Sequence, residues 1–217
     1  MIHILTNTYR VIDPWFGGPR RPIELDMGCG KGGFLLALAE RRPDRLVLGS
    51  DVMLGRLRRV ARKIERRGLR NVELLRAENF ELAAFQLPDG CIQRVHILCP
   101  DPWPKGRHRA RRLITSEFLG RLARLLAPGG VVHLATDHEP YLRTFRVVLG
   151  ADRRFRPDPG GVADVADIRS DFEKQWLAEG RRVPHLAFRF SPESAVRSRI
   201  PDAPVPALAP GPGERRE

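Results

Sequence analysis

The alternation of two hydrophobic patterns along the chain is the feature that most constrains its fold. Apolar runs typical of buried strands occupy residues 22–26, 45–50, 72–75, 92–98 and 131–136, and segments with helical periodicity separate them. Strands that alternate with helices in this way pair in parallel, and each helix crosses over one face of the sheet. Phe155 and residues 186–190 supply two more strands, expected to be antiparallel. The sequence therefore predicts a doubly wound α/β fold with a seven-stranded, mostly parallel sheet and an antiparallel last strand.

The segments between these strands set the expected helices and domain limits. Helical patterns cover residues 32–41, 53–67, 115–126, 137–149 and 171–178. Gly68 is expected to end the second helix, and Pro128-Gly129-Gly130 to break the chain before the strand at 131–136. We expect an N-terminal segment over residues 1–21, one domain over 22–190, and a disordered Pro- and Arg-rich tail over 191–217.

Charge and cysteine content narrow the functional class. The 217 residues carry a formal net charge of +12, which favours a polyanionic partner. The three cysteines are far apart and form no Cys-x-x-Cys pair, so neither a disulfide framework nor a metal site is expected. The sequence contains neither an apolar run of membrane-spanning length nor a signal peptide. We therefore expect a cytoplasmic protein with no membrane partner, and the sequence leaves open whether it is a monomer or homodimer.

A glycine-rich segment at the first strand-to-helix junction predicts a cofactor site. Gly28, Gly30 and Gly32 alternate with other residues, which allows a tight turn and a close approach of the backbone to a ligand. Gly28, Gly30 and Gly33 also satisfy the dinucleotide pattern Gly-x-Gly-x-x-Gly, which alone is weak. Asp26 decides between the two ligands, because a carboxylate there repels a pyrophosphate but can hold an ammonium group. This favours S-adenosylmethionine over NAD.

Acidic residues also end the next three strands. Asp51 follows the second strand, Glu78 and Asn79 follow the third, and Asp101 follows the fourth. Any one of them alone is a common helix cap or turn residue. Together they fall at the carboxyl ends of successive strands, where open α/β sheets bind their ligands. Asp51 is expected to accept the ribose hydroxyls, and Glu78 to bond the adenine amino group.

After the glycine-rich segment and the strand-end acids, the loop Pro100-Asp101-Pro102-Trp103-Pro104-Lys105 is the third feature that indicates a function. Three prolines stiffen it, and it presents a carboxylate beside an indole. Basic residues follow it from Arg107 to Arg112. A rigid acid next to an aromatic ring and a row of cations suits chemistry on a nucleic-acid base, although a turn with a packed Trp is the simpler alternative.

With these features together, the chain resembles the bacterial tRNA (guanine-N7)-methyltransferases over residues 22–190. The most specific matches are Pro100 to Lys105 with the trailing Arg-His-Arg-x-Arg-Arg, Ala135-Thr136-Asp137 with Tyr141, and Ser170-Asp171-Phe172-Glu173. The resemblance implies a Rossmann-like class I methyltransferase fold, S-adenosylmethionine as methyl donor, and methylation of a variable-loop guanine in tRNA.

The resemblance also implies residue roles. By this resemblance, the cofactor site is formed by Asp26, Gly28, Gly30, Gly32, Asp51, Glu78, Asn79 and Asp101, with Asp101 as the catalytic residue. The guanosine site is expected to be formed by Lys105, Asp137, Ser170, Asp171, Phe172 and Glu173. Several residues depart from the usual family pattern: Asp26 and Asp51 stand where Glu is common, Glu78-Asn79 replaces Asp-Ala, and Ser170 replaces Thr.

Guanine N7 is already a lone-pair acceptor, so methyl transfer to it requires no proton removal. We therefore expect Asp101 to stabilise developing positive charge on the purine rather than to act as a general base. Lys105 is expected to donate to guanine O6 or to bind a phosphate. Two alternatives remain open at this point: a methyltransferase acting on an exocyclic amine of another nucleic acid, and a non-catalytic tRNA-binding protein.

Overall fold

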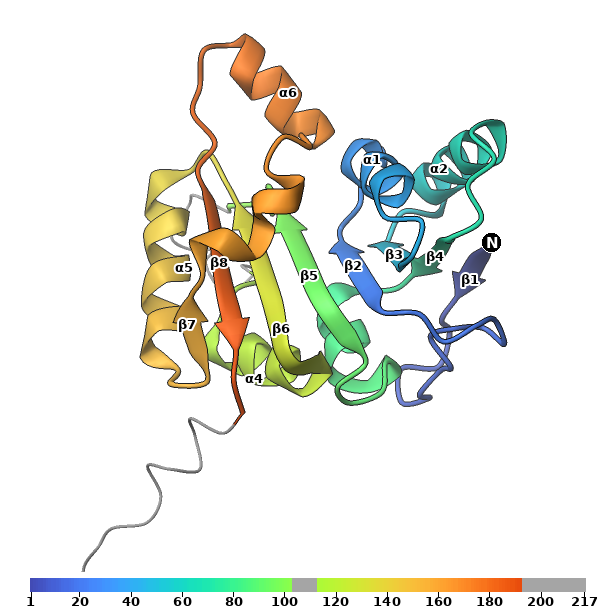
Figure 1. Ribbon diagram of the computed structural model, residues 1–217, viewed down its shortest axis with the longest axis horizontal. Helices are drawn as coiled ribbons and strands as arrows, with labels where there is room; N and C mark the ends of the chain where they lie inside the picture. Colours follow the sequence, from blue (N-terminus) through green and yellow to red (C-terminus); the bar gives the residue numbers. More distant parts are fainter. Residues whose placement is uncertain (103–112, 193–217) are drawn as a thin grey trace, which may run out of the picture.

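The computed structural model describes residues 1–102 and 113–192 as one mixed sheet covered by helices on both faces (Figure 1). Residues 103–112, which include the predicted substrate residue Lys105, lie outside the described residues. Residues 193–217 of the predicted tail also lie outside them. The strands are β1 (Ile2–Ile4), β2 (Ile23–Met27), β3 (Leu46–Asp51), β4 (Val72–Arg76), β5 (Ile92–Leu98), β6 (Leu126–Ala135), β7 (Phe155–Pro157) and β8 (His185–Phe190). The helices are α1 (Gly33–Arg41), α2 (Leu54–Arg66), α3 (Asn79–Glu81), η1 (Leu82–Gln86), α4 (Ser116–Leu125), α5 (Glu139–Ala151), η3 (Pro159–Val165) and α6 (Asp171–Ala178).

The sheet has eight strands in the order β1-β4-β3-β2-β5-β6-β8-β7. All neighbours from β1 to β6 pair in parallel, and β8 is antiparallel to both β6 and β7. The doubly wound arrangement and the antiparallel last strand are confirmed. The predicted strand number of seven is one too low, because Ile2–Ile4 of the N-terminal segment adds a short edge strand to β4.

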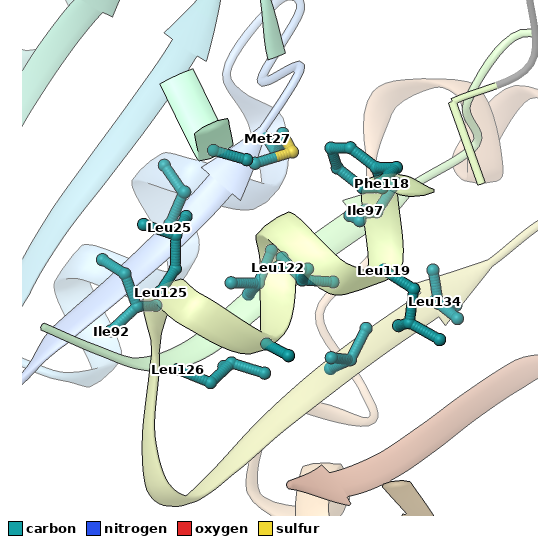
Figure 2. Packing of buried hydrophobic residues seen from close by; sticks show 14 of the residues in the cluster. Leu25, Met27, Ile92, Ile97, Phe118, Leu119, Leu122, Leu125, Leu126 and Leu134 are labelled. Carbon is teal, nitrogen blue, oxygen red and sulfur yellow. The ribbon is translucent and has the colours of Figure 1, made fainter. Parts of the chain in front are cut away.

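Successive residues of a strand point to opposite faces of the sheet, so the buried side chains form two separate hydrophobic layers. Leu25 and Met27 of β2 face the side covered by η1, α4 and α5, where Phe118 and Leu122 of α4 pack on them (Figure 2). Val47 of β3 and its neighbours face the side covered by α1, α2 and η3. Because β2 is covered on both faces, all five of its residues are buried, as expected for a central parallel strand.

The helix α2 shows how local sequence determines its position. Leu57, Val60 and Ile64 recur at helical spacing and are the buried residues of this helix. The helix ends just before Gly68, which adopts a left-handed φ of 63°. None of the helices within residues 1–102 and 113–192 is long and apolar enough to cross a bilayer.

Strand β6 begins earlier than the sequence predicts. Leu126 pairs with Ile92, and the next pair is Val131 with Arg94, so Pro128-Gly129-Gly130 lies within the strand as an irregularity. The predicted break is therefore an interruption of the pairing within β6, where five positions of β6 are opposite two of β5. Proline and glycine occur in strands at such irregular places.

Candidate active site

One cavity lies at the carboxyl ends of the central strands. Its volume is about 320 Å³, and its wall includes Asp26, Asp51, Glu78 and Asp101, each at or just after the end of a different strand. In Figure 1, α1 lies on one side of these strand ends and α6 lies above them on the other side. The parallel register of β2, β3, β4 and β5 is what brings four acids that are far apart in sequence to one place.

The glycine loop between β2 and α1 forms the floor of this cavity. Gly28, Gly30 and Gly32 all adopt left-handed φ values, of 84°, 57° and 80°, which favour glycine. At Gly32 space is also short, since an added Cβ would come within 2.9 Å of Val60 in α2. The amides of Gly28 and Cys29 both donate to the Ser50 carbonyl oxygen, at 3.0 and 2.8 Å, which fixes the loop to β3.

Asp26 is the most unusual acid of the site. Its side chain is 3% exposed, and among the described residues none donates a hydrogen bond to its carboxylate. Burial raises the pKa of Asp26 to about 7, and the neighbouring charges of Asp171 and Asp51 add to this effect. A buried carboxylate without a partner, lining a cavity, is suited to receive a cationic group of a ligand.

The acids at the carboxyl ends of β3 and β4 also support local backbone turns. Asp51 accepts a hydrogen bond from the Met53 amide at 2.7 Å, and Arg56 approaches its other oxygen at 3.4 Å. Glu78 caps α3 by accepting from the amides of Phe80 and Glu81, at 2.8 and 3.0 Å. Both carboxylates still line the cavity, so capping and ligand binding are compatible here.

Asn79 is tied to the glycine loop through one serine. The Ser50 hydroxyl donates to Asn79 Oδ1 at 3.1 Å and lies 3.4 Å from the Gly28 amide. The side chain of Asn79 therefore has a fixed position in the cavity wall.

The end of β5 has a distinctive backbone. Cys99 adopts a left-handed φ of 54°, which is uncommon for a residue other than glycine and is found at functional sites. Its amide is held by the Ala135 carbonyl oxygen at 2.8 Å. The turn places Pro100 and the exposed Asp101 in the cavity wall.

Helix α6 supplies the opposite wall. Ser170 and Glu173 form a reciprocal capping box at its N-terminus. Asp171 reaches the glycine loop, where its Oδ2 accepts from the Gly33 amide at 2.8 Å. Phe172 also lines the cavity and is 49% exposed. The predicted segment 170–173 thus meets the predicted cofactor loop directly.

Two predicted substrate residues do not line the cavity. Glu173 is 1% exposed and is bound by His185 and Arg169, at 2.8 and 3.0 Å. Asp137 forms an ion pair with Arg181. The residue before α5 is His138, which caps the helix by accepting from the Tyr141 amide.

Sequence reasoning missed several residues of the wall. Phe34 of α1, Arg56 of α2 and Gln175 of α6 all line the cavity. Arg56 had a usable signal, since it stands five residues after the strand-end acid Asp51, in the first turn of the next helix, and can reach back to it. Phe34 and Gln175 had none, because an apolar or amide residue in a helix is not specific to a site.

Solved structures of low sequence identity share this fold. The 16S rRNA methyltransferase KamB superposes with a TM-score of 0.58 at 20% identity, over 80% of this chain and 90% of that one. The aminoglycoside resistance methyltransferase NpmB1 gives 0.52 at 23% identity, over 78% and 87%. The chain therefore has the fold of the class I methyltransferases, with a cavity at the carboxyl edge of its sheet.

Relatives of higher identity define the family. A family model described as "Putative methyltransferase" matches residues 20–186. The tRNA (guanine-N(7)-)-methyltransferase of Thermus thermophilus is 37% identical over 199 residues, which are 88% of this chain and 59% of that protein. The enzyme of the same name from Halorhodospira halophila is 36% identical over 82% of this chain and 79% of its own length. The chain belongs to the tRNA (guanine-N7)-methyltransferase family.

Proposed function

We propose that this protein transfers the methyl group of S-adenosylmethionine to N7 of a variable-loop guanine in tRNA, in the cytoplasm. The observation that carries the proposal is the shared cavity of Asp26 and Asp101: a buried, unpartnered acid at a glycine loop and an exposed acid at the end of β5. The first suits the cationic end of the methyl donor, and the second faces the space left for an acceptor. Family membership supplies the acceptor, because both relatives described above carry the guanine-N7 name.

The residues present fit S-adenosylmethionine. Asp26 would hold its amino group, since the carboxylate has no donor among the described residues. Asp51 would accept the ribose hydroxyls, and Glu78 with Asn79 would face the adenine ring. Gly28, Gly30 and Gly32 give the backbone access that the methionyl portion needs. When bound, the cofactor supplies the electrophilic methyl group.

Asp101 is proposed to act on the purine electrostatically. It accepts from guanine N1–H or the amino group and stabilises positive charge that develops as N7 is alkylated. N7 carries no proton, so a base is not needed. Pro100 and Pro102 restrict the backbone on both sides of Asp101, which limits the reorganisation that the reaction needs.

Helix α6 is proposed to form the guanosine side of the site. Ser170 and Phe172 line the cavity and are available to a base, whereas Glu173 holds the helix start. Asp171 joins the helix to the cofactor loop through Gly33. Asp137 is proposed to orient the segment after α6 through Arg181. Lys105 is proposed to contact guanine O6 or a tRNA phosphate.

Binding of tRNA is proposed to follow the positive charge of the chain. Helix α2 exposes several cations on the face away from the sheet, namely Arg58, Arg59, Arg62 and Arg66. The helix lies next to α1 near the cavity edge of the sheet, so a backbone that enters the site can run along it (Figure 1).

The test is methyl transfer from labelled S-adenosylmethionine to unmodified tRNA, followed by nucleoside analysis. We expect N7-methylguanosine as the single product. An exocyclic product, which lacks the fixed positive charge of N7-methylguanosine, would assign the protein to a different acceptor. Asp101→Asn should lower kcat while the affinity for S-adenosylmethionine changes little, and near wild-type turnover in this variant would refute the electrostatic role.

A further inference from the structure

A chain of buried ionisable side chains crosses the sheet beneath the cavity. It runs from Glu24 on β2 through His96 on β5, His133 on β6 and His185 on β8 to Glu173 on α6. The successive distances are 3.1 Å from Glu24 Oε2 to His96 Nε2 and 2.9 Å between Nδ1 of His96 and Nδ1 of His133. They continue with 2.8 Å from His133 Nε2 to His185 Nδ1 and 2.8 Å from His185 Nε2 to Glu173 Oε1.

Water has little access to this chain. Glu24, His96 and His133 are fully buried, and the side chain of His185 is 17% exposed. Phe34 of α1 packs on the rings of His96 and His133, with centroids 4.8 and 6.2 Å away, and its other side lines the cavity. The histidines are arranged in a line rather than around a point, and no group of the described residues converges as a metal site.

The number of protons in the chain follows from its geometry. Each of the four contacts is a hydrogen bond and needs one hydrogen. A neutral imidazole carries a single N–H, so three neutral histidines supply only three. If both glutamates are ionised, a fourth proton is required. Without it, two nitrogen or oxygen lone pairs would face each other at less than about 3.1 Å in a buried site.

Both glutamates have cationic partners. Burial opposes ionisation of Glu24, but the hydrogen bond and charge of His96, together with Arg94 and Arg42, outweigh it and lower the pKa of Glu24. Glu173 lies 3.0 Å from Arg169. Arginine only donates, so Arg169 and His185 both direct N–H groups at the same carboxylate.

The fourth proton belongs at the least buried histidine. Burial lowers the pKa of His133 well below its usual value, and the neighbouring histidines add to the effect. Burial also lowers the pKa of His96, against the pull of Glu24. His185 is next to Glu173 and has partial access to water, and Arg169 Nη1 lies 3.3 Å from its Nε2. An imidazolium there donates to Glu173 and to His133, which leaves His133 to donate to His96 and His96 to Glu24.

We propose that His96, His133 and His185 hold one shared proton, placed mainly on His185, and that this proton positions Glu173 and the N-terminus of α6 against the cavity. The charged groups that face the chain from surrounding elements are Arg42, Arg45, Arg94, Asp164 and Arg169. The thiol of Cys99 faces Ser170 at the same helix start. Loss of the proton would break one of the four hydrogen bonds and loosen the helix that carries Ser170, Asp171 and Phe172.

The consequence for catalysis rests on the proposed function, whereas the proton itself can be observed without it. The first measurement is a ¹H–¹⁵N imidazole spectrum of the full-length protein between pH 5.5 and 9. We expect at pH 7 one imidazolium at His185, a neutral His133 protonated at Nδ1 and a neutral His96 protonated at Nε2. Three neutral histidines at pH 7 would overturn the proposal, whether or not the protein methylates tRNA.

The second measurement is the KM for tRNA at saturating S-adenosylmethionine in His185→Gln. Glutamine keeps a donor toward Glu173 but cannot carry the charge, so the KM should rise about fivefold at pH 7 while kcat stays within about twofold. The wild-type KM should rise as pH increases through the loss of the His185 proton, and the variant should show no such rise. The matched control is His3→Gln, which alters a His–Glu pair at the sheet edge, 2.9 Å from Glu73, and should leave the profile unchanged. A variant that keeps the wild-type pH profile would show that the proton does not position α6.

Discussion

Cofactor affinity should depend on pH through Asp26. The pKa of this acid is about 7 because it is buried and lies near Asp171 and Asp51. An ammonium group bound beside it favours the carboxylate form, so binding below pH 7 must release a proton. Protein with Asp26 protonated is a poor receptor for S-adenosylmethionine, and the fraction of protein with Asp26 ionised falls about tenfold for each pH unit well below the pKa.

The size of the effect follows from this pKa. Between pH 7 and pH 5 the binding free energy should become less favourable, by about 1.4 kcal/mol per pH unit at the lower end of the range. This corresponds to about a tenfold loss of affinity per pH unit. The amino group of the ligand stays protonated over this interval, since α-amino groups titrate near pH 8. The change in affinity therefore comes from protonation of the protein and not of the ligand.

Isothermal titration calorimetry in buffers of different ionisation enthalpy measures both the affinity and the number of protons released. About one proton should be released per cofactor bound at pH 5.5 and almost none at pH 8. Asp171→Asn is the informative variant, because removing its charge should move the midpoint to lower pH while the slope is kept. An affinity that is flat from pH 5 to 7, with no proton release, would refute the role of Asp26.

Three further predictions follow from the same site. Asp26→Asn should bind cofactor weakly yet raise the stability of the ligand-free protein at pH 8 by up to about 4 kcal/mol, measured by denaturant unfolding. The pKa of Asp26 is about 7 in the folded protein against an ordinary value of 3.8. The contribution of Asp26 to the free energy of unfolding is therefore fully present below pH 3.8 and is lost as pH rises to 7, so its removal stabilises the protein at pH 8. Gly32→Ala should destabilise the protein by about 1 to 2 kcal/mol, since φ is 80° and the new Cβ meets Val60 at 2.9 Å, whereas Gly120→Ala, which meets nothing within 4 Å, should not. Binding of tRNA should weaken about 10³-fold between 50 and 200 mM salt if six phosphates are contacted, and a flat response would contradict the backbone-binding model.

The sequence predicted most of the sheet because parallel strands covered on both faces are continuous apolar runs. β1 was missed because three residues give no periodicity, and the residues of β4 with which it pairs are 72 positions away. The helical segment Asn79–Gln86, which combines α3 and η1, was also missed. Its short apolar run after Glu78 has too few turns to distinguish a helix from a loop.

The gathering of the four acids could be predicted, since the ends of parallel strands share one edge of the sheet. The contact of Asp171 with Gly33 could not, because it joins residues 138 positions apart through the packing of α6. The histidine chain requires the register of four strands at once. His96 pairs directly with His133, but His185 is opposite Ala135, so only the folded sheet aligns the three rings.

Methyl transfer to N7 is tested most directly with a tRNA that carries 7-deazaguanine at the variable-loop position. The account predicts that unmodified tRNA accepts one methyl group there, while the 7-deaza tRNA binds with similar affinity and accepts none, because a C–H group replaces the nucleophilic nitrogen. Methyl transfer to the 7-deaza tRNA at a rate similar to that of the unmodified tRNA would place the reaction on another atom and contradict the account.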